Sequence, residues 1–135
     1  MKNYCYIKDD GGGIYGGGSG YGCDQVFVQK MSYVTDNMVL NGIGAPEGTN
    51  NDYDATHGIY LDDNASNVEI TGNTTANIRT SGLFLHNAHE IKITGNTVFN
   101  CRMQFLIQFN NCTYTLMSVM IPMLNLVSMG LEKRL

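Results

Sequence analysis

Acidic side chains beside two similar glycine-containing runs are the residues of this chain best suited to chemistry. Asp9 and Asp10 precede the run Gly11-Gly12-Gly13-Ile14-Tyr15, and Asp62 and Asp63 follow the run Gly58-Ile59-Tyr60-Leu61. Hydrolysis of a glycosidic bond needs two carboxyl groups, one as acid and one as base or nucleophile. The plainer interpretation of the Asp62-Asp63 pair is a solvated turn whose side chains bond to the backbone.

An internal repeat decides how these residues are positioned. The segment 58–81 resembles the segment 82–101, with Gly58 recurring as Gly82 after 24 residues and Asn73 recurring as Asn96 after 23. A fainter third copy, 105–112, is expected to follow at the same step of 24. That step would place Ile107 beside Leu83, Phe109 beside Leu85 and Cys112 beside Ala88.

Apolar and polar residues alternate within each repeat, which predicts short strands. Ile59 and Leu61 alternate with Tyr60 and Asp62, and Leu83 and Leu85 continue the pattern one repeat later. Strands that recur every 23 to 24 residues pair in parallel with their own copies, so the chain must wind as a coil. We therefore predict an all-β fold, a parallel β-helix of a few coils, with an Asn73–Asn96 ladder. An antiparallel β-sandwich is the alternative.

The two ends of the chain follow the repeat less closely. Gly13-Ile14-Tyr15 resembles Gly58-Ile59-Tyr60 at a distance of 45 residues, which fits two coils or one coil with a long loop. We predict coils over residues 1–112, and an irregular tail or cap over 113–135. Because no cap is visible at either end, we expect a fragment of a longer protein that is able to associate end to end.

Outward-facing residues of successive coils should form columns. Asp62, His86 and Asn110 would make a polar column beside an aromatic column of Tyr60 and Phe84. Aromatic faces stack on sugar rings and polar groups bind hydroxyls, so this face predicts a glycan groove. His57 would tune the carboxyls or hold a hydroxyl, and Tyr15 would line the groove; an ordinary surface histidine is the alternative for His86.

The segments 11–18, 57–66 and 82–96 resemble the right-handed β-helix repeats of pectate-lyase-like proteins, and more narrowly β-helical glycoside hydrolases. This resemblance implies a right-handed solenoid and a paired-Asp mechanism. On it we assign Asp10 and Asp62 as the catalytic pair, with Asp63 as the third candidate. It also implies an extracellular or periplasmic location, although the N-terminus shows no signal peptide.

The composition of the chain limits which classes of partner and ligand we expect. The net charge is −4, with eight scattered basic residues, so nucleic acid is not expected as a partner. The apolar stretch 114–131 contains Pro122 and Asn125, which argues against a membrane span. The four cysteines form no CxxC pair, so zinc is not expected either, and Cys101 and Cys112 should face the core. We expect no metal and no cofactor; calcium held by oxygen ligands from Asp52, Asp54, Asp62, Asp63 and Asn64 is the alternative.

Three functions remain open. The first is a glycoside hydrolase acting on a polysaccharide or oligosaccharide, of which this chain would be an active or inactive piece. The second is a lyase or epimerase of uronic-acid polymers, which would need a cation and a base such as Lys92 or Arg79. The third is a non-catalytic glycan-binding or structural β-helix module. Neither the sugar nor the oligomeric state follows from the sequence.

Overall fold

The computed structural model describes residues 1–6, 10–18, 30–44, 55–109 and 119–126. Every secondary-structure element in these ranges is a β-strand, and every strand pairing is parallel. The strands are β1 (Lys2–Tyr4), β2 (Gly11–Gly17), β3 (Ser32–Thr35), β4 (Met38–Gly42), β5 (Thr56–Asp62), β6 (Ser66–Thr71), β7 (Thr74–His86), β8 (His89–Gln108) and β9 (Val119–Leu126). The predicted all-β parallel β-helix is therefore confirmed.

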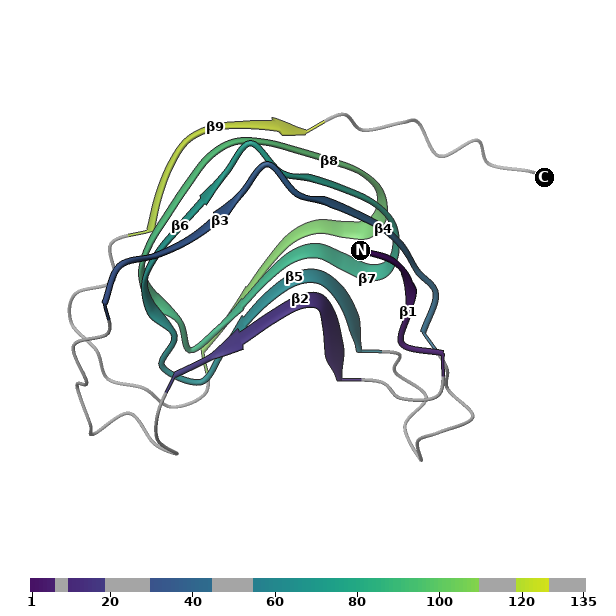
Figure 1. The fold of residues 1–135 in the computed structure, drawn as a ribbon, viewed down its shortest axis with the longest axis horizontal. Coiled ribbons are helices and arrows are strands. Elements are labelled where there is room, and N and C mark those ends of the chain that lie inside the picture. The colour runs from purple at the N-terminus through teal and green to yellow at the C-terminus, as the bar shows by residue number, and fades with distance from the viewer. Residues whose placement is uncertain (7–9, 19–29, 45–54, 110–118, 127–135) are drawn as a thin grey trace.

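The strands stack into three faces that wrap around one interior (Figure 1). One face contains β2, β5 and the later halves of β7 and β8. A second contains β3, β6, the start of β8 and β9, and the third contains β1, β4, the first half of β7 and the middle of β8. The long strand β7 belongs to two faces and β8 to all three, because both continue around corners of the coil; the register between them shifts at one corner, between Ile78 and Ser81.

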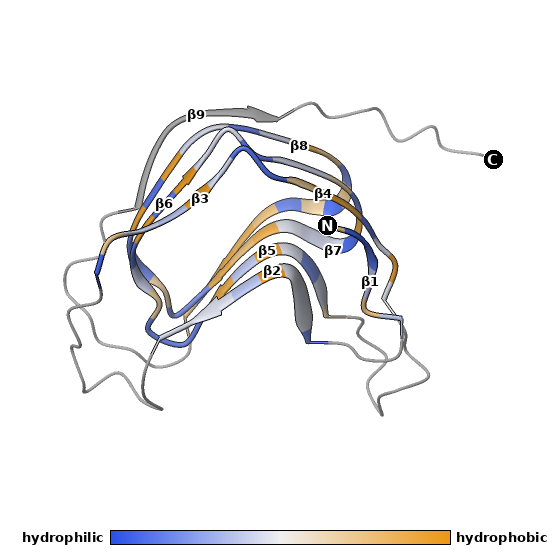
Figure 2. Ribbon diagram, in the orientation of Figure 1, coloured by the Kyte–Doolittle hydropathy of each residue, from blue (hydrophilic) through white to orange (hydrophobic). Residues whose placement is uncertain are grey.

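Aliphatic side chains from all three faces fill the interior. Hydrophobic and hydrophilic residues alternate along the strands, as the orange and blue segments of Figure 2 show. The alternation places every second residue of a strand inside the coil, which is why the sequence alternates. The buried cluster consists of Val39, Ile59, Leu61, Ala65, Val68, Ile70, Leu83, Leu85, Ala88, Ile91, Ile93 and Val98. Cys101 packs against this cluster as expected, whereas Cys112 lies outside the described residues.

The strand register confirms two sequence-based alignments, of residues 14–15 with 59–60 and of 59–61 with 83–85, and corrects a third. Ile14 pairs with Ile59 and Tyr15 with Tyr60, so the step of 45 residues is a single coil with long connections. Leu83, however, pairs with Phe105 and not with Ile107, and His86 pairs with Gln108. The third step is therefore 22 residues, not 24. A slip of two residues keeps apolar side chains inside, so the alternation could not reveal it.

Stacked asparagines hold neighbouring coils together at two corners. Inside, the Asn73 amide donates to the Asn96 side-chain oxygen (2.9 Å), and the Asn37 amide donates to the Asn73 side-chain oxygen (3.0 Å). The predicted Asn73–Asn96 ladder is thus present, with Asn37 as a third rung. Outside, an exposed ladder joins Asn3, Asn41, Asn77 and Asn100. All four outer residues have positive φ, between 50° and 57°, a conformation that asparagine tolerates better than most residues do.

Strand β9 lies within the predicted tail and pairs with β8 from Ile91↔Val119 to Val98↔Leu126. The division of the chain at residue 112 stays a prediction. Within the part of the chain described, there is no helix long and apolar enough to cross a membrane.

Replacing Asn96 by Ala should lower the free energy of unfolding by about 2–4 kcal/mol. The substitution strands the carbonyl oxygen of Ile70 and the backbone amide of Asn73, both of which bond to the buried Asn96 side chain. Chemical denaturation followed by circular dichroism measures the change. The control is Asn100→Gly, which removes an exposed rung but keeps the left-handed backbone, and should cost less than about 1 kcal/mol. Equal losses in both variants would contradict this account of the inner ladder.

Candidate functional site

A pocket opens on the outer side of the face formed by β2, β5 and β7, with a volume of about 310 Å³. It is lined by Asp10, Ala55, His57, Tyr60, Asp62, Asp63, Phe84, His86 and Gln108. Seven of the nine candidate residues from the sequence, Asp63 among them, thus share one pocket. Their catalytic and sugar-binding roles stay predictions.

Two candidates do not line this pocket. Tyr15 lies at its edge, where its hydroxyl donates a hydrogen bond of 2.7 Å to Oδ2 of Asp62. Asn110 lies outside the described residues, and the predicted column of Asp62, His86 and Asn110 is wrong at its third member. Gln108 pairs with His86 and takes that place because the third step is two residues shorter than predicted. Gln108 is not among the candidate site residues from the sequence for the same reason.

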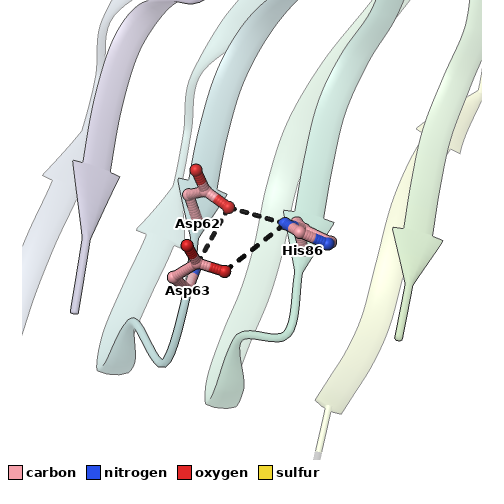
Figure 3. Close-up of side chains that lie close together, drawn as sticks. All are labelled: Asp62, Asp63 and His86. Atoms are coloured by element: carbon pink, nitrogen blue, oxygen red, sulfur yellow. Dashed lines mark hydrogen bonds and ion pairs between the residues drawn. The ribbon is translucent and has the colours of Figure 1, made fainter. Parts of the chain in front are cut away.

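Parallel pairing brings the polar groups together at a corner. Asp62 ends β5 and His86 ends β7, and the two strands pair side by side from His57↔Ser81 to Leu61↔Leu85. Nδ1 of His86 therefore lies 2.7 Å from Oδ1 of Asp62 and 3.7 Å from Oδ1 of Asp63. Figure 3 shows the imidazole directed between the two carboxylates.

The turn after β5 turns the Asp63 side chain back toward His86. Asp63 has a φ of 23°, and its amide donates to Oδ1 of Asp62 at 2.9 Å. The backbone amide of Gly18 bonds to the carbonyl oxygen of Asp63 at 2.9 Å. A Cβ at position 18 would lie 2.4 Å from backbone atoms of Asn64, so only glycine allows this approach. Gly18 of the glycine-rich segment therefore stabilises the acidic turn through a backbone hydrogen bond that a larger residue would prevent.

Hydrogen bonds keep Asp62 ionised. Burial acts to raise the pKa of this carboxyl, but hydrogen bonds from Tyr15, His86 and the Asp63 amide outweigh burial and hold the pKa below its usual value. The same Tyr15–Asp62 bond raises the pKa of the Tyr15 phenol, so Tyr15 keeps its proton. At neutral pH the site therefore presents a carboxylate with a neutral phenol on one of its oxygens.

Aromatic rings form the floor of the pocket. Tyr60 and Phe84 stack with ring centroids 4.7 Å apart, Phe84 stacks on His86 at 5.8 Å, and His57 lies 4.4 Å from Phe84. Tyr60 and Phe84 are only 3% and 6% exposed, so they cover one another and leave little ring face open. The sequence predicted the column but not this burial, because outward alternation alone suggests exposure.

His57 is a buried histidine with a defined partner. Its Nδ1 lies 2.6 Å from Oγ of Ser81, and it is 1% exposed. Burial lowers its pKa to about 4, although the Asp62 charge opposes the shift. His57 is therefore a neutral imidazole at physiological pH. Ser81, which the sequence analysis missed, fixes the orientation of the ring.

Asp62, Asp63 and His86 form a group that can hold a metal ion. One donor atom from each side chain lies within 4.8 Å of the others. Metal–nitrogen and metal–oxygen bonds are about 2.0–2.2 Å long, so donors on opposite sides of one ion stand roughly 4 Å apart. His86 and Asp62 are 19% and 13% exposed and Asp63 is 41% exposed, which leaves the group open to solvent on the Asp63 side.

Comparison with known proteins gives one result. Residues 7–118 match the family described as periplasmic copper-binding protein (NosD). No curated protein and no solved structure matches the chain.

This match settles some of the expectations drawn from the sequence. A periplasmic family agrees with the expected extracellular or periplasmic location, and the chain is placed there. The expectation that no cofactor is involved is wrong, because the matched family is described as copper-binding. The match supports a parallel β-helix but not the narrower likeness to glycoside hydrolases.

The free energy of unfolding should fall by about 3 kcal/mol as the pH drops from 6.5 to 4. His57 binds a proton near pH 6.5 when unfolded but only near pH 4 when folded, so its contribution is complete above pH 6.5 and is lost through this window. Asp62 adds a further loss below pH 3.8, where the unfolded carboxyl takes up a proton first. Urea titrations at several pH values measure both.

The variant His57→Asn should remove the part of the pH dependence between 6.5 and 4, since an asparagine amide can still bond to Ser81 without titrating. The control variant His89→Asn changes a histidine outside the pocket and should keep the dependence. An unchanged slope in His57→Asn would refute the assignment.

Proposed function

The chain belongs to the NosD family of periplasmic copper-binding proteins, and on that premise we propose that it is a non-catalytic β-helix module that binds Cu²⁺ through Asp62, Asp63 and His86. The observation that carries the proposal is the meeting of three donor atoms from two coils within 4.8 Å of one another.

The chemistry of the donors fits the oxidised ion. An imidazole nitrogen and two carboxylate oxygens suit Cu²⁺, which tops the affinity order of divalent first-row metals for nitrogen and oxygen sites. Cu⁺ prefers thiolate and thioether sulfur. The cysteines in the described residues, Cys5 and Cys101, do not line the pocket. The proposed site therefore favours Cu²⁺ over Cu⁺.

The surrounding residues support the ligands in the manner typical of metal sites. Phe84 stacks on the His86 ring at 5.8 Å and limits its rotation, and Asn87 lies 3.4 Å from Nε2 of the same ring. Groups that orient a ligand in this way commonly contribute to metal affinity. The bound ion would replace the contact between His86 and Asp62 and balance the charge of the two neighbouring carboxylates.

Loss of His86 should weaken Cu²⁺ binding about 100-fold or more, because the imidazole is the only nitrogen donor of the group. Isothermal titration calorimetry of the full chain with CuCl₂ measures the affinity, and electron paramagnetic resonance reports the coupling of the copper to nitrogen. The variants are His86→Ala and Asp62→Asn.

The matched control is His89→Ala, which removes a histidine next to Glu90 and outside the pocket. This variant should bind copper as the unaltered chain does. Copper binding that survives in His86→Ala, or a nitrogen signal that disappears in His89→Ala, would overturn the assignment. Binding should also weaken as the pH falls, because protons compete for the carboxylates and the imidazole.

A second candidate function is hydrolysis of a glycan by paired carboxyl groups. The observation that favours it is that Asp10 lines the same pocket as Asp62 and Asp63. The lowered pKa of Asp62 suits a base or nucleophile, which leaves Asp10 or Asp63 as the proton donor.

On this alternative, Asp62→Asn would abolish the release of reducing ends from a panel of polysaccharides, while Tyr33→Phe, a change on the exposed part of β3, would not. If the unaltered chain releases no reducing ends from any of them, the alternative is rejected and the binding module stands alone.

A further inference from the structure

The carboxylate of Asp62 presents its two oxygens to different partners. Oδ2 accepts the hydrogen bond of 2.7 Å from the Tyr15 hydroxyl. Oδ1 accepts a bond of 2.9 Å from the Asp63 amide and lies 2.7 Å from Nδ1 of His86. Oδ1 is therefore the oxygen that faces the other two ligands, and Oδ2 is hydrogen-bonded to Tyr15 of β2.

The position of Tyr15 is fixed by the fold. Tyr15 lies on β2 and pairs with Tyr60 of β5, and the two rings meet edge to face at 5.0 Å with an interplanar angle of 86°. Gly17, two residues later, pairs with Asp62 itself. The hydroxyl thus reaches Asp62 from a strand whose register is set by at least six residue pairs, whereas the Tyr15 side chain is 55% exposed.

From this arrangement we propose that Tyr15 determines which metal the site accepts, by holding Oδ2 of Asp62 and so limiting that carboxylate to a single donor oxygen. The inference rests on the proposed function, because it assigns selectivity to the same three-ligand site. Tyr15 is a positioning residue here and not a ligand.

The consequence differs between metals. Ca²⁺ takes six to eight oxygen ligands, and carboxylates often supply both of their oxygens to it. Cu²⁺ is satisfied by fewer nitrogen and oxygen donors in a tetragonal arrangement, to which each carboxylate can give one oxygen. When only Oδ1 of Asp62 is available, Ca²⁺ loses one oxygen ligand, whereas Cu²⁺ keeps the single oxygen that it needs from this carboxylate.

The Tyr15 hydroxyl donates to Oδ2 of Asp62 and acts on the ion only through that carboxylate. Selectivity would thus come from a residue that never touches the metal.

The test compares Cu²⁺ and Ca²⁺ affinities of the full chain, measured by isothermal titration calorimetry, in the unaltered protein, in Tyr15→Phe and in Tyr33→Phe. Tyr15→Phe keeps the ring contact with Tyr60 and removes the hydroxyl alone. We expect it to raise the Ca²⁺ affinity about tenfold, the scale of one charge-assisted hydrogen bond, and to change the Cu²⁺ affinity less than about threefold. Tyr33→Phe removes the hydroxyl of another exposed tyrosine, on β3, and should match the unaltered chain in both titrations.

Three results would overturn the proposal. An unchanged ratio of Cu²⁺ to Ca²⁺ affinity in Tyr15→Phe would show that the hydroxyl has no part in selectivity, while the copper site itself would stand. A phenolate-to-copper charge-transfer band that is lost together with copper affinity in Tyr15→Phe would make Tyr15 a ligand. If the unaltered chain binds no Cu²⁺ at all, the proposed function fails first, and the inference fails with it.

Discussion

Parallel stacking in register is the constraint on which the rest of this structure depends. Neighbouring strands lie about 4.8 Å apart, so every side chain meets the residue one coil before it and the residue one coil after it. Inside, this constraint requires aliphatic residues to stack on aliphatic residues, as Ile59 does on Leu83. At the corners it requires groups that satisfy each other in a row, as the amides of Asn37, Asn73 and Asn96 do. A polar group at the same corner of two coils is brought within bonding distance by the same rule, and this is how Asp62 meets His86.

Sequence reasoning recovered the features that depend on this repetition. The recurrence of Gly58 at Gly82 and of Asn73 at Asn96 is a direct record of which residues are neighbours, so the fold and the Asp62–His86 contact could be predicted. The third coil could not be aligned correctly. A shift of two residues preserves the alternation of inside and outside, and Gln104, not a glycine, stands before Phe105 where Gly82 would recur.

Other features depend on side-chain packing and left no signal in the pattern. Tyr60 and Phe84 occupy outward positions yet are almost completely buried, because each ring covers the other and His57 packs beside both. The Ser81 hydroxyl on His57 and the Gly18 amide on the acidic turn likewise arise between coils. Asp62 and Asp63, which together with Asp10 suggested glycoside hydrolysis by residue type, become a candidate metal site once His86 is placed beside them. Residue type without a register therefore does not decide the chemistry.

The large sequence separation between paired residues also affects the rate at which the chain folds. Each contact between coils closes a loop of 22 to 45 residues, as in His86↔Gln108 and Tyr15↔Tyr60, and hairpins, which form quickly, are missing from the described residues. Chains dominated by such non-local pairing fold slowly, since the entropy of loop closure is lost before contacts compensate for it. The shortest loops join β5, β7 and β8, so the least entropy is lost when folding begins in this region. Pairing β2 with β5 closes a loop of 45 residues and loses more entropy. Asp62, Asp63 and His86, the residues of the proposed copper site, belong to the part that closes early, whereas Tyr15 belongs to the coil that closes late.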